Sequence, residues 1–289
     1  MSSRKRWFAI AVVGAAVTAP LLYAQFKASS RRVEVYATVF DNQGHPMDGL
    51  EKNRLTVLDN GAPQPILSFE SAGDDISIAI LIDTTGSMND TLPSVKNAVS
   101  KMLEQMRPGD AAAVYGFNIS LVTLQDFTTD KAAARTAVLR MRAAGGTALF
   151  DAIAGVSQAI ADRPGKKAIV LFADGADNSS QLKANAAIRR AVKTGVPIYA
   201  VAEGDALQEG ALLKQLRSVA AQTGGVCYQA RNSKEVARVF GDIQSELKHV
   251  YLFSYKPPDG METNWRTIQL LIGGAKDYKI RGKQGYFPE

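Results

Sequence analysis

Short apolar runs and amphipathic stretches alternate between residues 76 and 247 of this 289-residue chain. The first apolar run, residues 76–82, is almost uninterrupted, which is typical of a strand buried on both faces. Similar runs follow at 111–117, 168–173 and 198–202. Between the runs, apolar residues recur at helical spacing, which indicates helices that cover a sheet. This order predicts an α/β fold, a doubly wound and mostly parallel sheet with helices on both faces.

One strand of this sheet is expected to run the other way. Residues 121–127 form another extended stretch, and they follow the run at 111–117 with no room for a helix. A parallel pair needs a crossover of roughly a dozen residues or more, whereas an antiparallel pair needs only a short turn. The spacing therefore predicts a hairpin and an antiparallel strand at one edge of the sheet.

The segments on either side of this region carry a different pattern. Residues 31–72 and 248–289 read as short strands separated by turns, and helical periodicity is absent from the first of them. Each segment is too short to bury a sufficient core alone. We therefore expect one small β-sandwich built from residues 31–72 and 248–289, with the α/β domain, residues 74–247, inserted between its strands.

The first 24 residues have the composition of a secretory signal peptide. A basic start precedes an apolar run over residues 7–22, and Ala24 supplies a small residue before the cleavage point. The run is shorter than the roughly 20 residues that a membrane-spanning helix prefers. An uncleaved anchor stays open as the alternative, because Leu22 is a poor residue two positions before Ala24. In both cases we expect an exported protein, periplasmic or extracellular, either released or anchored to the cytoplasmic membrane.

Composition excludes several classes of function. The 34 basic and 28 acidic residues give a formal charge of +6, but three of the basic residues lie in the leader, so the remainder is too weakly basic for nucleic-acid binding. A single cysteine, Cys227, excludes an internal disulfide, a cysteine-ligated zinc site and an iron–sulfur cluster, and we expect it to be a small buried apolar residue. Two histidines exclude a histidine-rich transition-metal site. Any metal here is therefore held mostly by oxygen.

Oxygen-bearing side chains follow several of the predicted elements at one edge of the sheet. Asp83, Thr85 and Ser87 come directly after the first strand, on a tight loop. Thr147 opens a later helix, and Asp174 follows another buried strand. Doubly wound sheets bind ligands at their carboxyl edge, and two carboxylates with three hydroxyls suit a hard divalent cation. Mg²⁺ is the predicted metal, with Mn²⁺ or Ca²⁺ as alternatives. If the first loop is taken alone, the competing interpretation is a strand–helix connection whose side chains cap the helix.

This set resembles the metal-ion-dependent adhesion site of von Willebrand factor type A domains, whose pattern is Asp-x-Ser-x-Ser, a distant Thr and an Asp before Gly. The resemblance extends over residues 76–246, and it departs from the pattern at Thr85, where the family usually has Ser. The order of segments also resembles bacterial secreted proteins of the VWFA-related type. The resemblance implies that Asp83, Thr85, Ser87 and Asp174 hold the metal directly or through water. It implies a direct contact from Thr147 when a ligand is bound.

Two further acids lie near these loops in the sequence. Asp90 follows Asp83 by seven residues, where integrin β subunits have one acid of a second metal site. Its neighbour Thr91 lacks the second carboxylate, so Asp90 is more typical of an acid at a helix N-terminus. Asp177 is a candidate to support Asp174 from outside the metal's own ligands, or else a solvated loop residue.

These features together predict a metal-dependent binding or adhesion module and not an enzyme. We expect a protein partner that presents an Asp or Glu carboxylate to the cation, no nucleic-acid partner, and membrane contact only through an uncleaved N-terminal segment. The chain has no Gly-x-Ser-x-Gly, no phosphate loop with Gly-Lys-Ser or Gly-Lys-Thr, and no Gly-x-Gly-x-x-Gly. Two alternatives stay open: a metal-dependent hydrolase such as a phosphoesterase, and an envelope assembly subunit whose site is vestigial.

Cleavage of the leader predicts a mature chain that begins near Gln25. N-terminal sequencing of the protein from the native envelope measures this directly. A start at Met1 or Ser2 in a membrane fraction would instead identify an uncleaved anchor.

Overall fold

The structure is a computed structural model that describes residues 32–203, 207, 210–258, 264–274 and 277–288. The predicted leader, residues 1–24, lies outside these residues, so its cleavage and the export of the chain stay predictions. Within the described ranges, no helix is both long enough and apolar enough to cross a membrane.

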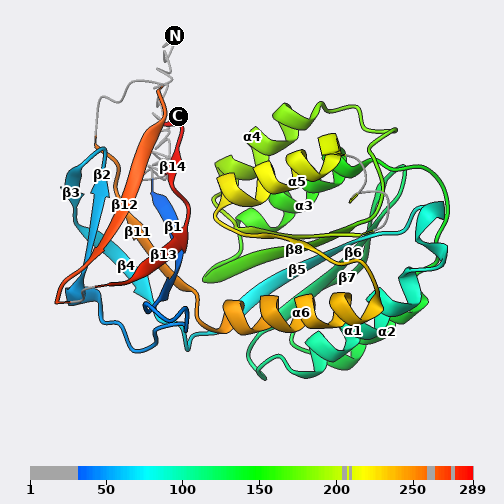
Figure 1. Ribbon diagram of the computed structural model, residues 1–289, viewed down its shortest axis with the longest axis horizontal. Coiled ribbons are helices and arrows are strands. Elements are labelled where there is room, and N and C mark those ends of the chain that lie inside the picture. The colour runs from blue at the N-terminus through cyan, green and yellow to red at the C-terminus, as the bar shows by residue number, and fades with distance from the viewer. Residues whose placement is uncertain (1–31, 204–206, 208–209, 259–263, 275–276, 289) are drawn as a thin grey trace, which may run out of the picture. The chain divides into compact units, whose positions relative to one another are not determined.

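A six-stranded sheet forms the centre of the α/β part, in the order β10-β9-β8-β5-β6-β7 (Figure 1). Its strands are β5 (Ile76–Asp83), β6 (Ala111–Phe117), β7 (Leu121–Thr128), β8 (Lys166–Ala173), β9 (Ile198–Ala202) and β10 (Cys227–Gln229). Strand β5 pairs in parallel with both β6 and β8, and all eight of its residues are buried. Strand β7 runs antiparallel to β6. The parallel sheet and its antiparallel edge strand confirm the fold class expected from the apolar runs.

Helices cover both faces of this sheet (Figure 1). Those on one face are α1 (Leu92–Glu104), α2 (Lys131–Arg140) and α6 (Ser233–Lys248), and those on the other are α3 (Leu149–Ala161), α4 (Ala184–Thr194) and α5 (Gly210–Thr223). The sequence pattern did not indicate α2, because its buried residues are mostly alanine and its apolar period is weak. This helix is capped by Asp130, whose Oδ1 accepts hydrogen bonds from the Ala132 and Ala133 N–H groups at 2.9 and 3.0 Å.

Two antiparallel sheets are built from the segments on either side of the α/β part, in the orders β13-β1-β11-β4 and β14-β12-β2-β3. Their strands are β1 (Val33–Phe40), β2 (Leu55–Asp59), β3 (Ala62–Gln64), β4 (Ile66–Glu70), β11 (Tyr251–Tyr255), β12 (Arg266–Ile272), β13 (Lys279–Gly282) and β14 (Gly285–Tyr286). The inner faces share an apolar core that includes Val35, Val57, Phe253 and Ile268. Each sheet therefore draws strands from both ends of the chain.

A buried carboxylate ties the two antiparallel sheets together. Asp59, at the end of β2, is fully buried and accepts hydrogen bonds from Tyr255 Oη at 2.9 Å and from Tyr286 Oη at 2.7 Å. Arg266 Nε lies 2.6 Å from its Oδ1 as an ion pair. Because a cation and two hydroxyls surround it, this charge is compensated inside the protein.

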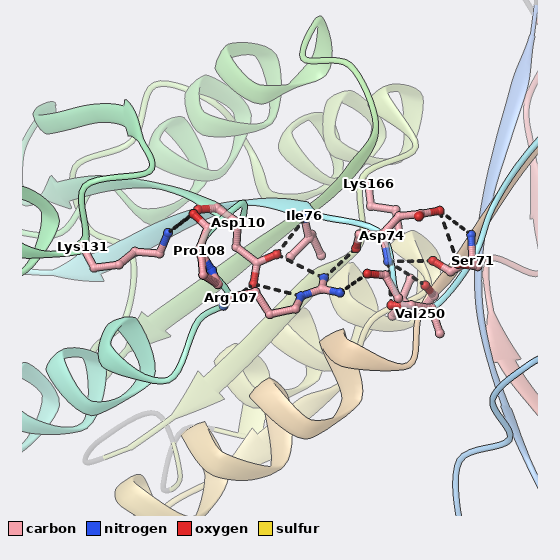
Figure 2. A network of polar contacts seen from close by, with 11 residues as sticks. Ser71, Asp74, Ile76, Arg107, Pro108, Asp110, Lys131, Lys166 and Val250 are labelled. Carbon is pink, nitrogen blue, oxygen red and sulfur yellow. Dashed lines mark hydrogen bonds and ion pairs between the residues drawn. The ribbon is translucent and has the colours of Figure 1, made fainter.

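A second polar network fixes the two crossings between the antiparallel sheets and the α/β part (Figure 2). Lys166, at the start of β8, is buried, and its Nζ donates to the Ser71 and Ala72 carbonyls at 2.8 and 2.9 Å and to the Val250 carbonyl at 3.4 Å. The chain enters the α/β part just after Ala72 and leaves it just before Val250, so one ammonium group holds both crossings. Burial lowers the pKa of Lys166 to about 8.

An arginine beside this lysine fastens the start of the central strand (Figure 2). Arg107 donates to the Gly73 and Asp74 carbonyls and forms an ion pair with Asp110 at 3.1 Å. Asp110 Oδ1 in turn accepts a hydrogen bond from the Ile76 N–H, the first of β5, at 3.0 Å. The amino edge of the sheet is thus held by charged groups that all have partners, and the predicted metal ligands lie at the opposite edge.

A truncated chain that ends at Leu247 tests the expected division into a β-sandwich and an inserted domain over residues 74–247. The truncation removes every strand partner of β1 and β4 in the described sheets and leaves only the β2–β3 pair. Because an isolated two-stranded hairpin is marginal in water, residues 32–70 should become sensitive to limited proteolysis while the α/β part stays resistant. The full chain is the control, and protection of residues 32–70 in the truncated chain would contradict a shared sandwich.

Candidate metal centre

The centre begins at the end of the buried middle strand. Asp83 is the last residue of β5, and its Oδ1 accepts a hydrogen bond from the Thr85 N–H at 2.9 Å, so the chain turns around the carboxylate. Thr84 fixes this turn to the neighbouring strand, because its N–H and its hydroxyl both donate to the Phe117 carbonyl, at 2.8 and 2.9 Å. The Asp83 carboxylate is therefore held in place at the carboxyl edge of the sheet.

The hydroxyl groups of the same loop form a chain of contacts that reaches a second strand. Thr85 Oγ1 and Ser87 Oγ are 2.9 Å apart, and Ser87 Oγ donates to Asp174 Oδ1 at 3.0 Å. Asp174 follows β8, which is a parallel neighbour of β5. The loops after these two strands therefore present their oxygens to one another.

Thr147 reaches the same place from a third loop. A methyl group added at Gly175 would lie 3.5 Å from Ser87 Oγ and 3.9 Å from Thr147 Oγ1, so both hydroxyls border the space that a side chain there would fill. Asn178 holds the backbone of Thr147. Its side-chain Oδ1 accepts a hydrogen bond from the Thr147 N–H at 2.9 Å, and its backbone N–H donates to the Thr147 carbonyl at 3.0 Å. The structure thus brings together all five residues predicted as metal ligands.

The Asp83 carboxylate is incompletely compensated. Its side chain is fully buried, and its Oδ2 has no hydrogen-bond partner among the described residues. Burial, together with the charge of Asp174, raises the pKa of Asp83 to about 7 against the opposing hydrogen bonds from Thr85. A buried acceptor without a partner is costly, and Asp59 shows that this chain can surround a buried carboxylate with donors. The environment of Asp83 is the one expected of a carboxylate that a cation completes.

The set of oxygens suits a hard divalent cation. It offers two carboxylates and three hydroxyls, and Mg²⁺, Mn²⁺ and Ca²⁺ all favour oxygen ligands. Across the part of the chain that the structure describes, no three His, Cys, Asp or Glu side chains gather as metal ligands, so a site here depends on its hydroxyls. The residues that would hold the ion are Asp83, Thr85, Ser87, Thr147 and Asp174, and their role as ligands stays a prediction.

The two further acids occupy the connections next to this centre. Asp177 Oδ2 accepts hydrogen bonds from the Phe150 N–H at 3.1 Å and from the Ser180 hydroxyl at 2.5 Å, so it fastens the loop after β8 to the first turn of α3. Asp90 is exposed and directly precedes Thr91, the N-cap of α1. That position agrees with an acid that faces the positive end of a helix dipole.

Sequence reasoning missed two residues at this edge, Asn178 and Glu203. Glu203 follows β9 as Asp174 follows β8, and it is buried. An acid at the end of a buried strand is the signal that it shares with Asp83, so the pattern could have indicated it. Asn178 carries no such signal, because its function is to hold the backbone of Thr147 and any polar loop residue looks the same in the sequence.

The cysteine lies at the edge of the sheet. Cys227 is the first residue of β10 and is half-buried, which corrects the expectation of a buried residue. Burial raises the pKa of its thiol to about 11, so the thiol stays protonated at neutral pH and is a poor nucleophile.

Comparison with protein families identifies the α/β part. The model of the von Willebrand factor type A domain matches residues 77–245, more than half of the chain. Curated relatives include a UPF0353 protein of Mycolicibacterium gilvum, 25% identical over 200 residues, and the UPF0353 protein MAV335 of Mycobacterium avium, 26% identical over 201 residues. Each match covers 59% of this chain and 60% of the relative, so the chain spans about three fifths of the length of these relatives.

Solved structures share the fold at low identity. A von Willebrand factor type A protein from Catenulispora acidiphila superposes with a TM-score of 0.53 at 16% identity, over 88% of this chain and 73% of that one. Proximal thread matrix protein 1 from the mussel byssus, with a zinc-occupied MIDAS motif, gives 0.53 at 18% identity over 64% and 49%. The von Willebrand factor domain of the type V pili tip protein Mfa5 from Porphyromonas gingivalis gives 0.50 at 15% identity over 59% and 94%. At these identities the likeness shows the fold alone.

The raised pKa of Asp83 predicts how the stability of the metal-free chain depends on pH. The folded state keeps the Asp83 proton up to about pH 7, whereas the unfolded state loses it near the ordinary value of 3.8. The resulting stabilisation is present at low pH and is lost as the pH rises through about 7. In chelator, the thermal midpoint should therefore fall from about pH 5 to about pH 8, and it should fall less in Asp83→Asn.

Mg²⁺ provides the control for this prediction, because a bound cation favours the ionised carboxylate and should offset the fall at the higher pH. The same pH dependence in the wild type and in Asp83→Asn would contradict the assignment to Asp83.

Proposed function

The chain belongs to the von Willebrand factor type A domain family, and we propose that it is an exported binding module that engages a protein partner through a divalent cation. The cation is expected to be Mg²⁺, held by Asp83, Thr85, Ser87, Thr147 and Asp174. The observation that carries this proposal is the buried Asp83 Oδ2, which has no partner among the described residues although hydroxyls and a second carboxylate lie next to it. A divalent cation would supply positive charge to the Asp83 carboxylate, whose pKa no described cation lowers.

An open position on the cation is the basis for binding a partner. Asp83 and Asp174 offer two formal negative charges, and Mg²⁺ held by one or two carboxylates keeps some of its waters. Helix α3 begins at Leu149, two residues after Thr147, so its positive N-terminal end favours negative charge at the same edge. A carboxylate of the partner, from an Asp or Glu side chain, matches both the cation and the helix end.

An apolar surface beside this edge supports a protein partner over a small carboxylate. Ile119, in the turn between β6 and β7, is 66% exposed, and a methyl group added at Gly146 would lie 3.6 Å from its Cγ2. Because Gly146 directly precedes Thr147, Ile119 lies at the rim of the proposed centre. Val122 and Leu124 of β7, the strand that follows this turn, are also exposed. Contacts with apolar side chains add affinity that a free carboxylate does not provide.

The hydrolase alternative finds no specific support in the described residues. It needs either a second metal or a positioned base. His45 and His249 are paired with acids of the connection after β1, with Nδ1 lying 3.4 Å from Asp41 and 2.7 Å from Asp48. We therefore propose a module that binds its partner without turnover.

Export and an adhesive role are proposed together. The leader has the composition of a signal peptide, and a tip protein of type V pili shares the fold of the α/β part. A partner protein in the envelope, or on the surface of a second cell, would agree with both the leader and the shared fold.

Metal binding by the purified full chain is the first test of the proposal. Titration with Mn²⁺, followed by electron paramagnetic resonance, should show a saturable site. Asp83→Ala and Asp174→Ala should each weaken Mn²⁺ binding by about 100-fold or more, because each removes a charged ligand. Asp90→Ala is the matched control, since it removes an exposed acid of the neighbouring turn. No saturable site in the wild type would favour the vestigial alternative and contradict the proposal.

Capture of a partner from an envelope extract tests the second half of the same proposal. The partner should be retained in Mg²⁺, released by chelator and lost with Asp83→Ala, whereas Ile119→Ser should weaken capture and leave the Mn²⁺ affinity unchanged. A partner that binds equally well in chelator would overturn the role of the cation. Turnover of a generic phosphate ester that disappears in Asp83→Ala would favour the hydrolase.

A further inference from the structure

Glu203 is a buried acid at the carboxyl edge that the proposed function leaves without a role. It directly follows β9, and its N–H donates to the Ala173 carbonyl at 3.2 Å. The parallel register pairs Ala173 with Ala202, the last residues of β8 and β9, so Asp174 and Glu203 are the first residues after two adjacent strands. The hydrogen bond to Ala173 holds Glu203 against the end of β8, so the backbone of Glu203 lies beside that of Asp174.

The Glu203 carboxylate is enclosed and incompletely satisfied. The residue is 5% exposed, and its Oε2 has no hydrogen-bond partner among the described residues. Burial, together with the charge of Asp174, raises the pKa of Glu203 to about 7. This carboxylate contributes a charge to the edge and receives no compensation from a described cation.

The needs of the fold do not account for such a group. Glu246 is also a buried acid of the α/β part, and its Oε2 accepts from Tyr228 Oη at 3.1 Å and pairs with Arg281 at 2.6 Å. At the carboxyl edge, in contrast, Asp83 Oδ2 and Glu203 Oε2 both lack a partner in the described structure. Since β8 lies between β5 and β9, these two oxygens belong to acids on the two sides of Asp174.

We propose that Glu203 is a further acid of the cation site and binds the ion through water, on the side of Asp174 away from Asp83. This inference rests on the proposed metal centre and extends it from two carboxylates to three. A contact through water is favoured over a direct one, because the three acids do not gather as a ligand group within the described residues. Acceptors that hold the waters and ligands of a metal raise its affinity and fix its orientation.

This position gives Glu203 a defined effect on the site. A third negative charge strengthens binding of the cation, and it lowers the positive charge that remains for a partner carboxylate. Glu203 thus sets the balance between holding the ion and attracting the ligand.

Glu203→Gln in the full chain separates this role from a structural one. Gln keeps the size of Glu, has no charge, and its amide can donate to Asp174. The Mn²⁺ affinity, measured by electron paramagnetic resonance, should fall by about tenfold or more. At pH 8 in chelator the thermal midpoint should rise, because the substitution removes a buried charge whose Oε2 has no partner among the described residues. Glu203→Asp, which keeps the charge on a shorter side chain, should retain more Mn²⁺ affinity than Glu203→Gln.

Glu246→Gln is the matched control, since it changes a buried acid whose partners are protein groups, and it should leave the Mn²⁺ affinity unchanged. Opposite signs for metal affinity and metal-free stability support the inference. A fall in both would identify Glu203 as a structural residue, and an unchanged Mn²⁺ affinity would exclude it from the site; either result overturns the inference. Absence of Mn²⁺ binding in the wild type would instead defeat the proposed centre itself, so the two failures are distinguishable.

Discussion

The Asp83 carboxylate lies at the end of a strand that is buried on both faces, and this placement shapes the carboxyl edge of the sheet. Strand β5 occupies the middle of the sheet, and all of its residues are buried, so its last side chain enters a region with little solvent. Three loops then bring hydroxyls and a second carboxylate to this point, and they bring no described cation. A buried carboxylate is unfavourable when neither hydrogen-bond donors nor a cation compensate its charge.

Several other buried charged groups of the same chain have partners within the protein, unlike Asp83 Oδ2 among the described residues. Asp59 is surrounded by an arginine and two tyrosines, and the Nζ of Lys166 donates to three backbone carbonyls. These groups hold the two antiparallel sheets together and fix the crossings into the α/β part. The amino edge of the parallel sheet is therefore stabilised by satisfied charges, whereas the carboxyl edge keeps acids such as Asp83 and Glu203 incompletely satisfied. Incomplete satisfaction at one place in an otherwise consistent fold is characteristic of a functional site.

The main features of the fold could be predicted from the sequence because buried parallel strands leave nearly continuous apolar runs. The antiparallel β7 was predictable because the gap after β6 is too short for a crossover. Helix α2 was missed because alanine, the main residue of its buried face, carries too little apolar contrast to mark a face.

The candidate site could be predicted in part. Asp83 ends β5 and Asp174 directly follows β8, so the topology alone places both residues at the carboxyl edge of the sheet. Asn178 was not predictable, since it acts on the backbone of Thr147 through a loop whose path depends on tertiary contacts. The state of Asp83 was not predictable either, because its pKa reflects burial and the distance to another acid, and a linear sequence specifies neither.

A crystal structure of the full chain grown with Mn²⁺ would show directly whether these side chains hold a cation. Anomalous difference density should show an ion bounded by the oxygens of Asp83, Thr85, Ser87, Thr147 and Asp174, either in direct contact or through water. The Asp83 carboxylate should face this peak. The absence of density between these side chains at saturating Mn²⁺, with their arrangement unchanged, would contradict the proposed metal centre.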